Sequence, residues 1–169
     1  MYSFQVTGSG RGLGRSIAQS LAKEGAKVIC VDINEKNNHE TAQLIKDEGG
    51  LAAAYTVNVA KVEQVMELAK TIEIEHGPVD ILVNNAALVM GMTVAEWDPA
   101  EIIASYNVNV LSLYWMVMAF LPSMRKRNDG HIVAISSISA LAPTICLSIY
   151  GATKAAVSSR SYNLNSYCT

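Results

Sequence analysis

The sequence has little of several features that mark specialised classes of protein. Its three cysteines, scattered among 169 residues, make neither a disulfide framework nor a zinc site. Lys and Arg number 13 against 15 Asp and Glu, and this near balance argues against a nucleic-acid-binding protein. The longest uncharged apolar run, Val110 to Leu121, is shorter than the roughly 20 residues that span a bilayer. We therefore expect no metal site, no nucleic-acid partner and no membrane anchor in this chain.

The composition is that of a folded chain. Half of the residues are hydrophobic and 17% are charged, which excludes a disordered protein and suffices for one buried core. Residues 1–6 lack the basic region and apolar block of a cleaved signal. The sequence thus predicts a single domain over residues 1–169, located in the reducing cytoplasm.

Strand-like and helical patterns alternate along the chain. Strands are predicted at residues 2–7, 27–32, 52–58, 80–83 and 131–136, and helices at 15–24, 36–48, 61–76, 95–127 with a break near Pro99, and from 150 onward. Such alternation is typical of an α/β fold with a parallel sheet and right-handed crossovers. We expect a Rossmann-type doubly wound sheet of order 3-2-1-4-5, with a ligand crevice where the first and fourth strands diverge.

A glycine-rich segment, T-G-S-G-R-G-L-G at residues 7–14, lies between the first strand and the first helix. Glycines permit positive φ and let the backbone approach a pyrophosphate, which the helix N-terminus stabilises. Leu13 rules out the G-x-G-x-x-G spacing, and no Gly-Lys-Ser/Thr follows to make a P-loop. A tight turn without a ligand is the alternative. The candidate dinucleotide contacts are Gly8, Ser9, Arg11, Gly12, Leu13 and Gly14.

Asp32 and Arg11 bear on which dinucleotide the chain prefers. An acid at the end of the second strand, where Asp32 lies, can bind both ribose hydroxyls of NAD and repels the extra phosphate of NADP. The guanidinium of Arg11 could instead accept that phosphate. Asp32 could also be only the acid that precedes the next helix. We expect NAD as the preferred cofactor and keep NADP as possible.

Tyr150 and Lys154 stand at positions i and i+4 of the last predicted helix, so their side chains share one face. A free phenol has a pKa of about 10. It therefore needs a nearby cation to shuttle protons at neutral pH. Ser137 follows the fifth strand, where its hydroxyl could hold a carbonyl or alcohol oxygen. A tyrosine and lysine at helical spacing are often merely exposed. Their combination with the glycine segment and Asp32 favours a catalytic site.

These motifs, joined by Asn84-Asn85-Ala86, Asn109 and Ser136, make the chain resemble a classical short-chain dehydrogenase/reductase from Thr7 to about Ser158. The resemblance implies hydride transfer between NAD(P) and an alcohol or carbonyl group. It makes Tyr150 the general acid/base and Ser137 the group that polarises the substrate oxygen. Lys154 would bind the nicotinamide ribose and stabilise the phenolate, and Asn109 would hold a proton-relay water. Further cofactor contacts implied are Ile33, Asn58, Val59, Asn85, Ala86, Ala87, Tyr150 and Lys154.

Two substitutions depart from the family pattern: Ala87 replaces a glycine and Asn58 an aspartate. Local phrases such as Val31-Asp32-Ile33-Asn34 and Leu121-Pro122-Ser123-Met124 resemble the retinol and hydroxysteroid dehydrogenase branch, which includes the epidermal retinol dehydrogenases. That branch acts in lipid metabolism, often at the endoplasmic reticulum membrane or lipid droplets. The resemblance therefore implies a lipophilic alcohol or ketone, retinol- or steroid-like, as substrate.

The resemblance also bears on completeness and assembly. Family members continue beyond the position of Lys154 with a full helix and two more strands, so we expect a C-terminally incomplete domain that lacks the last strands. A catalytically inactive nucleotide-binding fragment, which acts by associating with full-length subunits, is the alternative function. The apolar helix expected over 102–124 could pair two copies into a homodimer, or could simply be buried.

Overall fold

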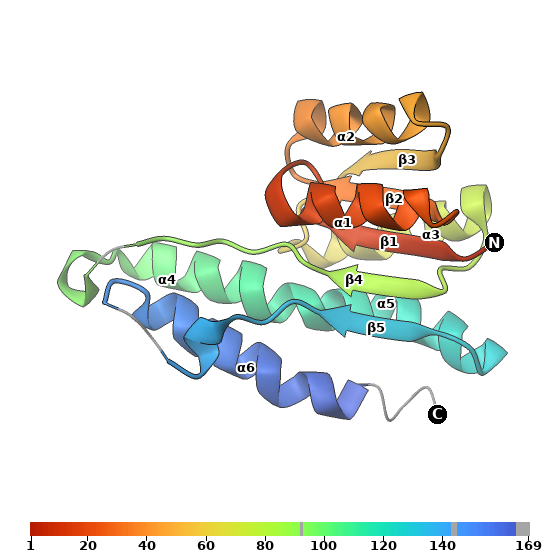
Figure 1. The fold of residues 1–169 in the computed structure, drawn as a ribbon. Coiled ribbons are helices and arrows are strands. Elements are labelled where there is room, and N and C mark those ends of the chain that lie inside the picture. The colour runs from red at the N-terminus through yellow and green to blue at the C-terminus, as the bar shows by residue number, and fades with distance from the viewer. Residues whose placement is uncertain (92, 143–144, 165–169) are drawn as a thin grey trace.

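A five-stranded parallel sheet forms the centre of the structure, a computed structural model that describes residues 1–91, 93–142 and 145–164. The strands lie in the order β3-β2-β1-β4-β5 (Figure 1), which confirms the predicted topology. Their bounds are β1 (Ser3–Thr7), β2 (Lys27–Asp32), β3 (Leu51–Thr56), β4 (Ile81–Asn84) and β5 (His131–Ala134). The strand order changes direction between the parallel strands β1 and β4, and this switch point is where the crevice is expected.

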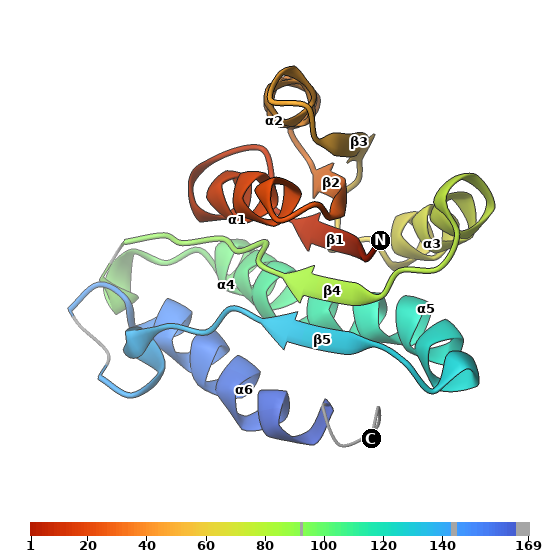
Figure 2. The ribbon, with the colours of Figure 1, turned by 45° about the vertical axis from the view of Figure 1, so that its right-hand side comes forward.

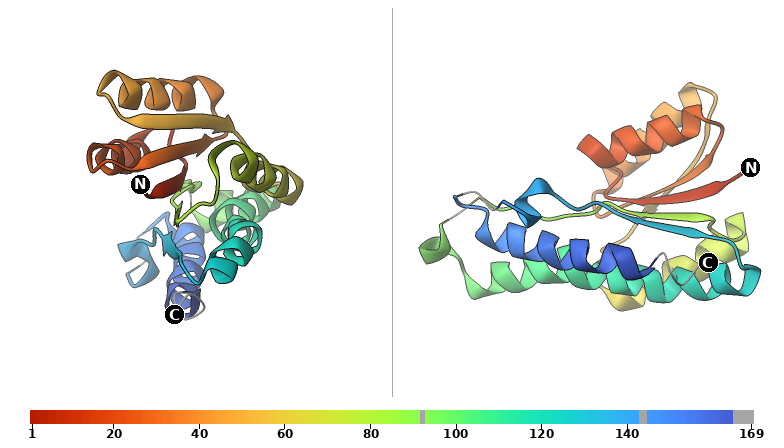
Figure 3. Two further views of the ribbon diagram at one scale, coloured as in Figure 1. Left: turned by 90° about the vertical axis from the view of Figure 1, so that its right-hand side faces the viewer. Right: turned by 60° about the horizontal axis from the view of Figure 1, so that its bottom comes forward.

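Helices cover both faces of the sheet. The helices are α1 (Gly12–Lys23), α2 (Glu35–Asp47), α3 (Val62–His76), α4 (Pro99–Tyr106), α5 (Ser112–Arg127) and α6 (Ser148–Leu164). Helices α1 and α2 pack on one face, and α3 and α5 on the other (Figures 2 and 3). Helix α6 runs alongside α4 and α5, and its Val157 joins the core beneath α5.

Strand β2 explains why the sheet is buried on both sides. Val28 and Cys30 belong to the core cluster under α1 and α2, whereas Ile29 and Val31 belong to the cluster under α3 and α5. All four side chains are inaccessible to solvent. A continuous apolar run is what a strand needs when successive side chains enter opposite cores.

The long helical run predicted over 95–127 is divided in the structure. The break near Pro99 is confirmed, since α4 begins there with Asp98 as its N-cap, whose Oδ1 accepts the Ala100 N–H at 2.7 Å. A π-helical turn, η2 (Asn107–Leu111), which the sequence pattern did not predict, then separates α4 from α5. Its wider turn changes the direction of the side chains at Asn109 relative to an uninterrupted helix.

By length and composition, the run from Pro99 to Arg127 could also cross a membrane, with a mean hydropathy of 1.4 over its best window. The uncharged stretch Val110 to Leu121, on which the sequence-based expectation rested, is only part of this longer run. Its α5 part contributes Met116, Phe120 and Met124 to the core.

Candidate active site

The glycine segment leaves backbone amides free at the start of α1. Gly8 and Ser9 donate their N–H groups to the carbonyl of Val31, at 2.8 and 3.3 Å. The N–H of Gly10 bonds to Asp32 Oδ2 at 2.8 Å. The first amides of α1, at residues 12–14, have no acceptor within their helix, and no side chain caps them among the described residues. With the positive end of the helix dipole, these donors suit a phosphate group.

Gly14 is required by close packing at this turn. A Cβ at Gly14 would lie 2.0 Å from the carbonyl oxygen of Gly8 and 2.5 Å from Asn85 Nδ2. Gly8 itself has a φ of +68°, a conformation that side chains with a Cβ rarely adopt. The two glycines therefore let α1 begin directly against the end of β1.

Thr7 fixes the relation between β1 and β4 at the crevice. Its Oγ1 accepts the N–H groups of Asn85 and Ala86 at 3.0 and 3.1 Å, and Asn85 Nδ2 donates to the Thr7 carbonyl at 2.9 Å. These bonds join the glycine segment to the Asn-Asn-Ala motif. The motif thus shapes the wall of the crevice.

A cleft of about 900 Å³ opens over this edge of the sheet. It brings together most of the cofactor contacts that the sequence predicts: Gly8, Arg11, Gly12, Leu13, Gly14, Asp32, Ile33, Asn58, Val59, Asn85, Ala86 and Ala87. Sequence reasoning missed Asn37, Leu88 and Val108, which also line it. Leu88 directly follows the predicted contacts Asn85, Ala86 and Ala87, so its position next to them in the sequence could have indicated it.

Ser9 is placed differently from the prediction. Its side chain is inaccessible to solvent, does not line the cleft, and donates to Asn38 Oδ1 at 2.8 Å. The cofactor contact at Ser9 stays a prediction, and in this structure its side chain does not face the cleft. The Ser9 hydroxyl points inward because its hydrogen-bond acceptor, Asn38, lies buried beneath the loop.

The Asp32 carboxylate accepts hydrogen bonds from two backbone N–H groups, one in the glycine segment and one just beyond Asp32. While Oδ2 holds Gly10, Oδ1 accepts the N–H of Asn34 at 2.8 Å. Both oxygens retain further lone pairs, and the residue lines the cleft. Arg11, which is exposed, lines the same cleft. The structure therefore brings together the two groups with opposite preferences for an additional ribose phosphate.

Lys154 and Tyr150 share the inward side of α6. The Lys154 side chain is 3% exposed, and its Nζ lies 5.7 Å from the centre of the Tyr150 ring. Burial lowers the pKa of Lys154 below its ordinary value. One of its three protons is donated to the carbonyl oxygen of Ile135 at 2.6 Å. The remaining donors leave the ammonium able to bind a hydroxyl group.

Asn109 and Ser137 lie outside the lining of the cleft, as do Tyr150 and Lys154. The Asn109 side chain bonds the backbone of Leu88 and donates to Thr153 Oγ1 at 3.0 Å, so it connects the cleft wall to α6. Ser137 is half-buried, and its Oγ accepts the N–H of Ser139 at 3.1 Å at the start of the turn η3 (Ile138–Ala140).

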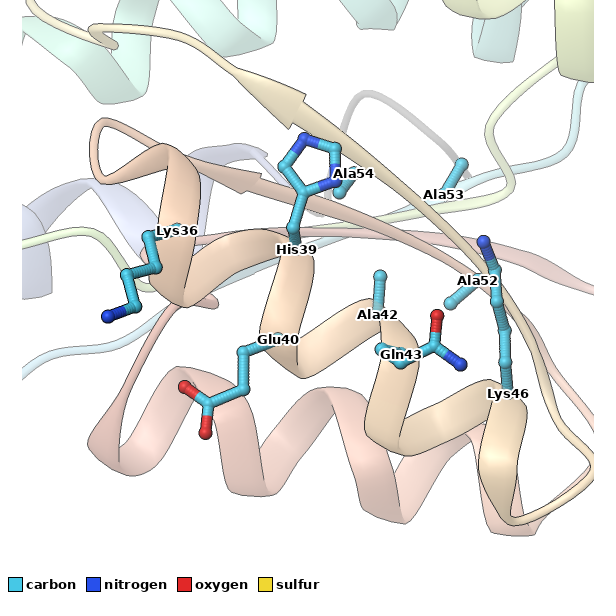
Figure 4. Close-up of a pocket in the computed structure, with 9 residues that line it drawn as sticks. All are labelled: Lys36, His39, Glu40, Ala42, Gln43, Lys46, Ala52, Ala53 and Ala54. Carbon is cyan, nitrogen blue, oxygen red and sulfur yellow. The ribbon is translucent and has the colours of Figure 1, made fainter.

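A second pocket, of about 600 Å³, lies on the outer side of α2 and β3 (Figure 4). Three consecutive alanines of β3, residues 52–54, line it from the strand, with Ala52 and Ala54 on the α2 side, where His39 and Lys46 extend from α2. None of the predicted site residues lines it, so the larger cleft is the candidate active site.

The site places a glycine turn at the switch point of a parallel sheet and a tyrosine–lysine pair on α6. This combination defines the dinucleotide-binding class of α/β folds. The model of the short chain dehydrogenase family matches residues 4–166. The chain belongs to the short-chain dehydrogenase family and is related to its retinol and hydroxysteroid dehydrogenases.

Individual relatives agree with this assignment. The chain is 39% identical over 150 residues to epidermal retinol dehydrogenase 2 of Mus musculus, a match that covers 88% of this chain and 48% of the relative. It thus spans about half the length of the curated relatives it matches. Among solved structures, 7α-hydroxysteroid dehydrogenase in complex with NADH and 7-oxo glycochenodeoxycholic acid has a TM-score of 0.90 at 29% identity, covering 98% and 66% of the chains. A gluconate 5-dehydrogenase from Burkholderia cenocepacia, in complex with NADP, has a TM-score of 0.89 at 30% identity, covering 98% and 67%.

Proposed function

We propose that this chain transfers a hydride between NAD(P) and the CH–OH or C=O group of a lipophilic alcohol or ketone. One observation carries the proposal: the cleft gathers the predicted cofactor residues around the uncapped amides of α1. The cradle at Gly14, which a Cβ would fill, fits the close approach of a pyrophosphate. When bound, the nicotinamide ring accepts or supplies the hydride.

The chain's own residues then handle the proton. The Tyr150 hydroxyl takes the proton of the alcohol as it is oxidised, or gives a proton to the carbonyl oxygen in reduction. The Lys154 ammonium, held near that ring, stabilises the phenolate and binds the ribose hydroxyls. The Ser137 hydroxyl holds the substrate oxygen, and the backbone of the π-helical turn at Asn109 holds the relay water.

The preferred coenzyme in this proposal is NAD. The Asp32 carboxylate lies in the cleft and would bind the two ribose hydroxyls, while its charge would repel a 2′-phosphate. Arg11 in the same cleft makes NADP the second choice.

Exposed apolar side chains support a lipophilic substrate. Ile138 and Leu141 follow Ser137 and are 75% and 83% exposed, and Ile145 precedes Tyr150 with 92% exposure. Such side chains near the catalytic hydroxyls suit an apolar molecule. Retinol and steroid alcohols are the compounds to test first, in keeping with a role in lipid metabolism. We place this activity in the cytoplasm.

The test compares the chain with its Tyr150→Phe variant. Calorimetric titration with NADH and NADPH measures binding, and coenzyme absorbance measures turnover of retinol and steroid alcohols. We expect Tyr150→Phe to lose at least about 100-fold in turnover while coenzyme affinity stays within about twofold. Binding without turnover in the unsubstituted chain would favour the alternative, an inactive fragment that associates with full-length subunits. Absence of saturable binding by folded protein would overturn the proposal.

We further propose that residues 102–124 pair two copies into a homodimer. Ile103, Leu111 and Met118 are exposed apolar side chains along this segment. Sedimentation should show a dimer that Met118→Glu dissociates, whereas Ile74→Glu, at an exposed site on α3, should leave it intact. A monomer in the unsubstituted chain would contradict this assembly.

A further inference from the structure

The carbonyl groups of the glycine segment are held from outside the cleft. Arg15 Nη2 donates to the carbonyl of Gly10 at 2.7 Å. The Thr41 hydroxyl on α2 lies 2.9 Å from the carbonyl of Ser9 and 3.1 Å from that of Asn37, so its single hydrogen is shared between them. Thr41 Oγ1 also accepts the Nε–H of Arg15 at 2.9 Å. One connected group of polar side chains therefore holds two successive carbonyls of the loop.

Asn38 extends this group into the sheet. Its Oδ1 accepts the Ser9 hydroxyl, and its Nδ2 donates to the carbonyls of Cys30 and Tyr55, both at 3.0 Å. The loop is thus joined through Asn38 to the ends of β2 and β3. A second attachment comes from Glu40, which pairs with Arg15 at 2.9 Å.

Most of this group is buried inside the fold. Ser9, Asn38 and Thr41 are all inaccessible to solvent, and none of them lines the cleft. Buried hydroxyl and amide groups cost free energy unless they are hydrogen-bonded. Apolar side chains would pack α2 against the sheet equally well. The polar groups therefore serve the loop, whose carbonyls they turn away from the cleft.

We propose that Arg15, Asn38 and Thr41 are positioning residues for the dinucleotide, an inference that rests on the proposed function. By holding the carbonyls of Ser9 and Gly10 toward α2, they keep the amides at residues 12–14 directed at the pyrophosphate. A loop fixed in its binding conformation loses less entropy when the ligand binds. The affinity for the coenzyme then depends on side chains that never touch it.

The test uses three substitutions in the whole chain. Thr41→Val keeps the shape of the side chain and removes the hydroxyl, and Thr41→Ser restores the hydroxyl. Thr71→Val is the matched control, because the Thr71 hydroxyl bonds only the Glu67 carbonyl of its own helix, among the described residues. We expect Thr41→Val to weaken NADH binding by about fivefold or more, with kcat at saturating coenzyme unchanged. Thr41→Ser and Thr71→Val should stay within about twofold.

Thermal unfolding and amide hydrogen exchange distinguish a loss of loop positioning from a loss of folding. Thermal unfolding shows whether each variant is folded. Amide hydrogen exchange at residues 9–11, measured without coenzyme, should be faster in Thr41→Val than in Thr41→Ser. Equal coenzyme affinity of Thr41→Val and the unsubstituted chain would overturn the inference, as would equal weakening by Thr41→Ser. If the unsubstituted chain bound neither coenzyme, the proposed function would fall, and unchanged exchange at residues 9–11 would remove the positioning role as well.

Discussion

The side chain of Asn109 is hydrogen-bonded to both backbone groups of Leu88: Oδ1 accepts the N–H at 2.7 Å, and Nδ2 donates to the carbonyl at 2.9 Å. Its other Nδ2 hydrogen goes to Thr153. Both amide hydrogens and one lone pair of Oδ1 are thus used in joining the cleft wall to α6. We expect any relay water at this residue to be held by backbone groups of the π-helical turn rather than by the side chain.

Asn109→Ala should therefore reduce stability as well as activity. Removal of a buried amide that satisfies Leu88 should cost about 1–3 kcal/mol, measured by urea unfolding. Asn109→Asp keeps the acceptor for the Leu88 N–H but loses both donors, so it should also be destabilising. Unchanged stability in both variants would show that these bonds contribute nothing to the fold.

Asp32→Ala should affect both coenzymes, but unequally. The loop loses its bond at Gly10, so NADH and NADPH should both bind more weakly. The loss should be larger for NADH because the ribose hydroxyls lose their acceptor while repulsion of the 2′-phosphate disappears. Arg11→Ala should weaken NADPH alone. An unchanged NADH to NADPH ratio in Asp32→Ala would mean that Asp32 does not set the preference.

Gly14→Ala should abolish coenzyme binding and destabilise the fold. The new Cβ would overlap backbone atoms of Gly8, so β1 and α1 would have to separate. Gly91→Ala is the control, because its Cβ would meet no atom within 4 Å. Calorimetry and thermal unfolding should show a large loss for Gly14→Ala and almost none for Gly91→Ala. Normal binding by Gly14→Ala would refute the close packing.

Stability should fall in mild acid because of His76. Its Nε2 lies 2.7 Å from the Tyr55 hydroxyl, with Glu75 3.9 Å away. Burial, aided by the Lys27 cation and opposed by Glu75, lowers the pKa of His76 below 6.5. The folded state therefore binds this proton less well than the unfolded state, so stability is lost as pH falls through 6.5 toward the folded pKa.

The measurement is urea unfolding between about pH 7.5 and pH 5. His76→Gln should lose less stability over this interval than the unsubstituted chain. His39→Gln, at an exposed imidazole, should retain the full loss. Identical pH dependence in all three proteins would contradict the assignment to His76.

Gln5 occupies the middle of β1 with no exposed surface, and neither its Oε1 nor its Nε2 has a hydrogen-bond partner among the described residues. A buried, unsatisfied amide costs free energy. Gln5→Met, of similar size, should raise the free energy of unfolding by about 1–2 kcal/mol in urea titrations. Gln5→Ala should lower it, because a cavity replaces the side chain. A loss of stability in Gln5→Met would show that the amide is satisfied in solution.

Local pattern was enough to predict the elements and their order. The unbroken apolar run of β2 fits a strand buried on both faces, and Pro99 marks the start of α4. The π-helical turn at Asn109 was not predictable, because its residues continue the apolar period of the flanking helices. The inward side chain of Ser9 was missed for a related reason: its partner Asn38 lies on another helix, far along the chain.

By itself, the sequence determined the succession of strands and helices along the chain, the glycine turn between β1 and α1, and the i, i+4 spacing of Tyr150 and Lys154. These depend on short-range periodicity and on backbone conformations that individual residues allow or forbid. Only the tertiary structure decided which side chains of the glycine turn face the cleft and which residues hold its carbonyls. Those orientations depend on hydrogen bonds between α1, α2 and β2, which exist only once these elements have packed together.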